Sequence, residues 1–188
     1  MTWRFPKRDD SQGQERPSFE QIVLPNLNAA YSLARWLVRD PQLAEDVVQD
    51  AVVRGLTYFS SFRGGDPRAW LMRIVRNTAY SALTAQQQSL RRLETRDGLA
   101  GEDALSVPDP GAGPEAALCG AQDAERLTEA LAALPPELRE CLVLRELEEL
   151  SYKEIALVTN VPIGTVMSRL WRARKMLLGA AAGGEDEH

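Results

Sequence analysis

The segment 151–176 constrains the fold most, because its sequence is typical of two helices joined by a tight turn. Ser151 and Glu154 have the spacing of a capping box, which begins the first of these helices. Asn160 tolerates left-handed backbone geometry, and the residue before Pro162 is pushed toward extended geometry. The first helix must therefore end near Asn160, and we expect the second to begin at about residue 163.

The second of these helices has one apolar stripe and one polar, basic stripe. Positions i, i+4, i+7 and i+11 are apolar and can pack inward: Val166, Leu170, Ala173 and Leu177. The opposite face carries Thr165, Ser168 and Arg172, flanked by Arg169, Arg174 and Lys175. A helix that presents hydroxyl and guanidinium groups in this way fits the major groove of duplex DNA. The alternative is an ordinary helical hairpin with a solvated basic face.

Charge is distributed unevenly along this acidic chain, whose formal net charge is -5. Residues 67–93 hold arginine and no acid, whereas residues 97–125 hold acids and no base. The second range is also rich in proline and glycine, which indicates a flexible acidic linker. Two locally basic units are therefore expected to flank an acidic connection.

The apolar spacing predicts an all-α chain with two small helical domains of three to four helices each, and no strand pattern competes. The expected boundaries are a disordered N-terminal arm at 1–17, a first domain at 18–95, the linker at 96–117, a second domain at 118–179 and a tail at 180–188.

Proline placement marks several expected helix starts. Asp40 and Asp66 are each followed by proline, which is the pattern of an N-cap and a first helical residue. The expected helices run over 19–38 with Pro25 in the first turns, 40 to about 58, 66 to about 86, 115–133 and 136–148, followed by the two helices of the hairpin.

Catalytic and metal-binding patterns are missing from the sequence. The two cysteines, Cys119 and Cys141, lack C-x-x-C spacing, and His188 is the single histidine, so the four ligands of a structural zinc site cannot be assembled. No nucleophile–base pair, carboxylate dyad or phosphate-binding glycine loop is found. We expect no enzyme activity and no cofactor. The polar N-terminus and the lack of a long apolar run predict a cytoplasmic protein without membrane insertion.

With these features, the chain resembles a bacterial extracytoplasmic-function (ECF, group IV) RNA polymerase sigma factor of the sigma-70 family. The resemblance covers residues 19–178 except the linker. Residues 40–50 are similar to the family's region 2.2, residues 70–79 to regions 2.3 and 2.4, and residues 134–174 to region 4. The order and spacing of the blocks make the set specific.

The resemblance implies a stress-response subunit that binds core RNA polymerase and directs initiation at promoters, reading the −35 element as duplex and the −10 element as a melted strand. The implied partners are the β′ coiled coil and β flap of core polymerase, promoter DNA and a separate anti-sigma factor. The free protein is expected to be a monomer whose two domains sample different mutual arrangements, with inhibition by masking of both domains.

The resemblance also assigns site residues. The polymerase-binding set is Glu45, Asp46, Gln49 and Asp50, which without the family would be interpreted as a solvated face. The −10 set is Phe62, Arg63, Arg73, Arg76, Asn77 and Tyr80, where Phe62, like the neighbouring Trp70, can alternatively be plain core. The −35 set is Thr165, Met167, Ser168, Arg169, Trp171, Arg172, Arg174 and Lys175.

One segment departs from the family pattern. After the −10 helix the family often has a basic run, whereas here Gln86, Gln87 and Gln88 come first and the bases follow at Arg91 and Arg92. Two alternative functions are a helix-turn-helix regulator that binds duplex DNA unaided, and a sigma-like decoy that binds an anti-sigma factor without touching DNA.

Overall fold

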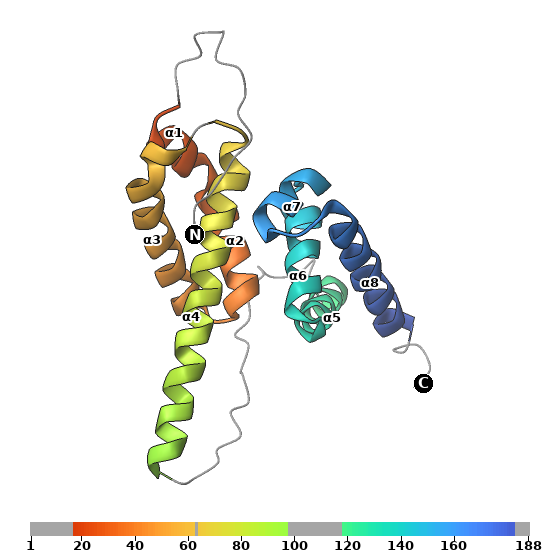
Figure 1. The fold of residues 1–188 in the computed structure, drawn as a ribbon. Helices are drawn as coiled ribbons and strands as arrows, with labels where there is room; N and C mark the ends of the chain where they lie inside the picture. Colours follow the sequence, from red (N-terminus) through yellow and green to blue (C-terminus); the bar gives the residue numbers. More distant parts are fainter. Residues whose placement is uncertain (1–16, 63, 98–117, 183–188) are drawn as a thin grey trace.

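A computed structural model describes residues 17–62, 64–97 and 118–182, and over these ranges the chain is helical with no strand (Figure 1). The N-terminal unit consists of α1 (Phe19–Val23), η1 (Leu24–Asn26), α2 (Leu27–Val38), α3 (Pro41–Tyr58), η2 (Phe59–Ser61) and α4 (Pro67–Asp97). The C-terminal unit consists of α5 (Leu118–Ala133), α6 (Pro136–Leu142), the π-helical turn η3 (Val143–Leu147), α7 (Tyr152–Thr159) and α8 (Ile163–Ala182). The predicted all-α class with two helical units is confirmed.

Local capping chemistry begins several of these helices where the sequence predicts. The Asp40 side chain accepts a hydrogen bond from the Leu43 backbone N–H at 2.9 Å, with proline in the first turn of α3. Ser151 and Glu154 form the expected capping box at α7. Asn160 ends α7 with φ 57° and ψ 43°, which is the left-handed conformation expected of it.

Three helix boundaries differ from the sequence prediction. The first helix is interrupted by the 3₁₀ turn η1, because Pro25 removes a backbone donor and its ring crowds the preceding turn. Helix α4 continues to Asp97 instead of stopping near 86, and its glutamine-rich stretch is made of good helix formers. Helix α6 gives way at Val143 to the π turn, so a single helix over 136–148 is not formed.

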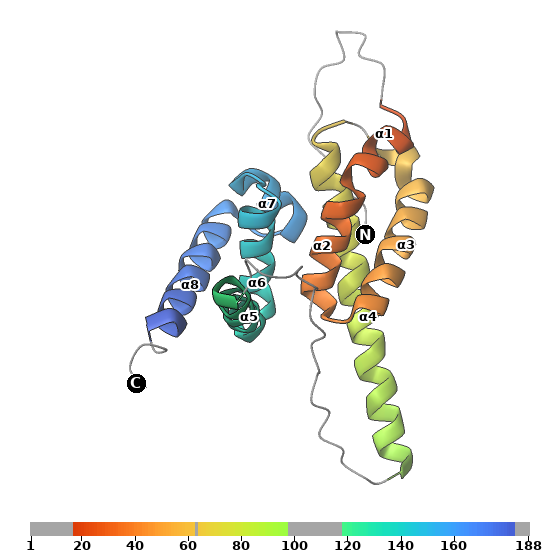
Figure 2. The ribbon, with the colours of Figure 1, turned by 180° about the vertical axis from the view of Figure 1, so that it is seen from behind.

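The N-terminal unit is a bundle in which α2, α3 and α4 pack pairwise on one another. Leu33 of α2, Val47 of α3 and Leu71 of α4 are buried at its centre. The later turns of α4 extend beyond the bundle, as both views show (Figures 1 and 2). None of the described helices is long and apolar enough to span a membrane.

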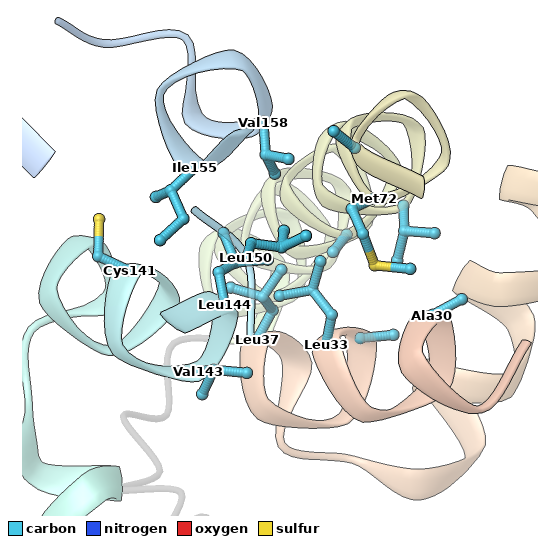
Figure 3. Close-up of a cluster of buried hydrophobic side chains, with 14 of the residues drawn as sticks. Ala30, Leu33, Leu37, Met72, Cys141, Val143, Leu144, Leu150, Ile155 and Val158 are labelled. Carbon is cyan, nitrogen blue, oxygen red and sulfur yellow. The ribbon is translucent and has the colours of Figure 1, made fainter. Parts of the chain in front are cut away.

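The two units are in direct contact. Helix α4 packs on α7, and α2 packs on α6, while α8 lies on the side away from the bundle in both views (Figures 1 and 2). Figure 3 shows Leu33 and Leu37 of α2 close to Leu144 and Leu150 of the C-terminal unit, and all four are buried. The structure thus presents one packed arrangement. The expected range of interdomain distances stays a prediction, and the linker over 98–117 lies outside the described residues.

Candidate nucleic-acid interface

Helix α8 buries the stripe that its sequence predicts. Val166, Leu170 and Ala173 are buried, and Leu177 is half-buried against the same core. The first turn forms through backbone bonds from the N–H groups of residues 165 and 166 to the carbonyl oxygen of Pro162. This packing fixes which side of α8 faces solvent.

The solvent side of α8 gathers most of the predicted −35 residues. Ser168 and Arg172 are exposed, Thr165 is half-buried, and the exposed fractions of Met167 and Trp171 are 50% and 63%. Large apolar side chains left in water on a helix that already has a buried stripe indicate a surface that meets a partner. The ammonium of Lys175 lies 5.2 Å from the centroid of the Trp171 ring, which orders this pair.

Two of the predicted −35 residues have partners within the protein. Arg169 is mostly buried, and its Nη1 lies 3.4 Å from Glu140 Oε1, so its guanidinium points toward the interior. Arg174 Nη2 donates to Glu146 Oε1 at 2.6 Å, and both side chains of that pair are about half exposed. The structure therefore separates Arg169 from the outward set, whereas Arg174 stays at the surface.

The four residues of the predicted polymerase face, Glu45, Asp46, Gln49 and Asp50, are all exposed on α3. The same face continues with Val53 and Leu56, whose exposed fractions are 64% and 60%. Sequence reasoning missed these two residues, although their positions seven residues after Asp46 and Gln49 place them on that face. The face is thus acidic at one end and apolar at the other.

The structure buries Phe62, one of the predicted −10 residues, among other aromatic rings. Its exposed fraction is 8%, and its ring centroid lies 5.2 Å from that of Trp70 and 6.4 Å from that of Phe59. Buried aromatic rings prefer to pack on one another in this way. This burial favours the core interpretation of Phe62 and Trp70, and the −10 role of Phe62 stays a prediction. Arg63 lies outside the described residues.

The predicted −10 residues on α4 differ in exposure and in hydrogen bonding. Asn77 is exposed and Arg73 is half-buried. Arg76 donates from Nε to Glu140 Oε2 at 2.8 Å and from Nη2 to Oε1 at 3.1 Å, while the Tyr80 hydroxyl donates to Oε2 at 3.0 Å. Burial, together with the charge of Glu140, raises the pKa of Tyr80 above its usual value.

A second contact between the units joins two carboxyl groups. The side chain of Asp66, the N-cap of α4, hydrogen-bonds the side chain of Glu154 on α7. Burial and the neighbouring Glu154 raise the pKa of Asp66. The hydrogen bonds from Asp66 and Ser151 lower the pKa of Glu154 to about 2.

Asp66→Asn is expected to remove the loss of stability that Asp66 causes in the wild type as pH rises above about 4. The folded-state pKa of Asp66 is raised, so its contribution to folding stability is complete below pH about 3.9, its usual pKa. That contribution is lost as pH rises through the raised pKa. Glu154 acts in the opposite sense: its contribution to folding stability is complete above pH about 4.3 and is lost as pH falls through its lowered pKa. Asparagine keeps the cap and cannot ionise.

Thermal unfolding midpoints of the wild type and of Asp66→Asn, measured from acid to neutral pH, test this expectation. Asp46→Asn, a change at an exposed carboxylate of α3, is the control and should follow the wild type. Parallel curves for the wild type and Asp66→Asn would show that the carboxyl pair is not formed in solution.

Comparison with known proteins agrees with this geometry. Residues 22–89 match the family described as Sigma-70 region 2, and residues 124–177 match Sigma-70, region 4. The chain is 33% identical over 171 residues to the RNA polymerase sigma-H factor of Pseudomonas aeruginosa, covering 88% of this chain and 87% of that protein. It is 39% identical over 174 residues to the ECF RNA polymerase sigma-E factor of Haemophilus influenzae, covering 88% of each.

A solved structure has a similar fold along most of its length. It is the sigma factor RpoE of Bartonella quintana in complex with the anti-sigma factor NepR. The TM-score is 0.68 at 29% identity, and the match covers 87% of this chain and 96% of that one. The similarity therefore extends over both helical units.

Proposed function

The chain belongs to the ECF group of the sigma-70 family of RNA polymerase sigma factors and directs promoter-specific initiation of transcription, and on this premise we propose how its surfaces divide that work. Helices α3 and α4 of the N-terminal unit and helix α8 of the C-terminal unit each provide one of these surfaces. The sigma factor brings promoter specificity to the polymerase, and the polymerase carries out the chemistry.

The outward face of α8 reads the −35 element in the major groove of duplex DNA. Ser168 and Arg172 are polar groups that can bond base edges, and Met167 and Trp171 suit thymine methyl groups and sugars. Arg174 and Lys175 contact phosphates, which position the helix without specifying sequence. This exposed face, on a helix whose other side is firmly buried, is the observation that carries the proposal.

Helix α4 holds the melted −10 strand. The Asn77 amide can bond a base edge, and Tyr80 provides a ring on which a base can stack. Arg73 and Arg76 are three residues apart on α4 and contact phosphates of the DNA strand. Phe62 supports the start of this helix, because its buried ring packs on that of Trp70 in the first turn of α4.

The α3 face docks on the β′ coiled coil of core polymerase, and the C-terminal unit meets the β flap. Acidic side chains at one end of the α3 face select a basic partner, and exposed Val53 and Leu56 supply the apolar area that a stable contact needs. We further assign a separate anti-sigma factor as inhibitor, supported by the similarity over both units to RpoE of Bartonella quintana, which was solved with NepR.

Promoter footprinting with and without core polymerase tests this division. The net charge of -5 opposes phosphate, so the free protein is expected to bind promoter duplex weakly. Core polymerase should raise the affinity at least tenfold and extend protection over both promoter elements. Tight, sequence-specific protection by the free protein, unchanged by polymerase, would favour a stand-alone helix-turn-helix regulator instead.

A further inference from the structure

Glu140 of α6 is a fully buried carboxylate at the junction of the two units. The exposed fraction of its side chain is 0%, and three side chains surround it. Arg76 and Tyr80 reach it from α4 of the N-terminal unit, and Arg169 reaches it from α8. Removing a carboxylate from water is costly unless it is paired and hydrogen-bonded, so Glu140 depends on these donors.

The donors around Glu140 form a site for an oxyanion. Arg76 engages both carboxylate oxygens in the two-point geometry that guanidinium groups also use for phosphate. The Tyr80 hydroxyl adds a third bond, and the Arg76 guanidinium lies 4.7 Å from the centroid of the Tyr80 ring. A phosphodiester oxygen pair can replace the carboxylate at these donors.

We propose that Glu140 is an internal competitor of DNA, which occupies the Arg76–Tyr80 site that a backbone phosphate of the −10 strand otherwise takes. This inference rests on the proposed function, because that function assigns Arg76 and Tyr80 to the −10 strand. The packed arrangement of the two units is then an autoinhibited form. Separation of the units frees the site, and occupation of the site by DNA keeps them apart.

Other contacts across the junction hold the same arrangement. Arg68 of α4 donates from Nη2 to Glu148 Oε2 at 2.7 Å, and the Glu148 side chain is only 6% exposed. The Arg39 guanidinium donates to the carbonyl oxygen of Ala132. Because these bonds come from the same two units as the Glu140 contacts, the Arg76–Tyr80 site opens only when the junction as a whole opens.

Glu140→Gln tests the competition, because it keeps the shape of the side chain and removes its charge. The probe is a short fluorescein-labelled single-stranded DNA of mixed sequence, titrated against the full-length free protein. We expect about tenfold tighter binding than for the wild type, since charge-assisted bonds are about twice as strong as neutral ones. Small-angle scattering of the same samples should show a larger radius of gyration.

Glu129→Gln is the matched control. It makes the same change of charge at an exposed acid of α5, in the same unit as Glu140. Its DNA affinity should stay within about twofold of the wild-type value and its radius of gyration should be unchanged, because a single exposed charge contributes little. Arg68→Gln provides a second route, because it breaks the junction without touching Glu140. It should tighten binding although it removes a positive charge.

The outcomes separate the inference from the proposed function. Equal affinities and equal radii for Glu140→Gln and Glu129→Gln overturn the inference, as does an expanded Glu140→Gln protein with no gain in DNA affinity. Should Glu140→Gln fail to unfold cooperatively in thermal melts, Arg68→Gln decides in the same assays. Transcription by core polymerase with the wild-type protein is measured separately. The absence of promoter-specific transcripts in that assay would overturn the proposed function itself.

Discussion

Replacing Asp46 and Asp50 together with lysine is expected to weaken binding to core RNA polymerase about a hundredfold while the protein stays folded. Both carboxylates are exposed on α3, and exposed charges contribute little to folding stability. The introduced lysines repel a basic partner surface, and the loss of charge pairs at an interface costs about 2–5 kcal/mol of binding free energy. Competition against labelled wild-type protein for core polymerase measures the loss, and circular dichroism checks the helical content.

Glu129→Lys controls for net charge, because Glu129 is an exposed acid on α5, away from the α3 face. Its affinity for polymerase should stay close to that of the wild type. An unchanged affinity in the double lysine variant would remove α3 from the polymerase interface. Val53→Ala and Leu56→Ala extend the test to the apolar end of the face, where we expect smaller losses without any dependence on salt.

Arg172→Ala is expected to relax the sequence requirement at one position of the −35 element. A lost bond to a base edge costs about 1–3 kcal/mol, which is about 5- to 150-fold in affinity, and the cost falls on the preferred base alone. Ser168→Ala should act in the same way at a neighbouring position. Holoenzyme binding to a series of promoters, each with one altered −35 base, measures the effect.

Lys175→Ala is the matched comparison, because Lys175 lies on the same helix but is assigned to phosphate. It should weaken binding to every −35 variant equally and reduce the salt dependence of the affinity. Titration at low and moderate salt separates the two classes of contact. Equal losses across all −35 variants for Arg172→Ala would make Arg172 a phosphate contact as well.

Features fixed by neighbouring residues were predictable from the sequence. The Asp40 and Ser151 caps, the left-handed Asn160 and the buried stripe of α8 each depend on residues within about two turns, and all are confirmed. The sequence prediction ends α4 near residue 86, whereas the glutamines that follow are good helix formers and the helix continues to Asp97.

Features fixed by distant residues could not be predicted in the same way. Phe62 packs with Phe59 and Trp70 only once η2 and α4 are in place. Glu140 follows the charged residues Glu137 and Arg139 in the sequence, so nothing local marks it as the buried acid. Its partner Arg76 is 64 residues away, and no local pattern specifies that pairing. The composition of the linker pointed to independent units, whereas the contacts between them depend on tertiary packing.

In vitro transcription on a promoter library tests the central claim most directly. The purified protein is added to core polymerase lacking other sigma factors, and the transcripts are sequenced. We predict that initiation depends on the protein and occurs downstream of one shared pair of −35 and −10 motifs, with the −35 preference altered by Arg172→Ala. No transcripts above those of core polymerase alone, together with sequence-specific protection of duplex DNA by the free protein, would contradict the assignment as a sigma factor.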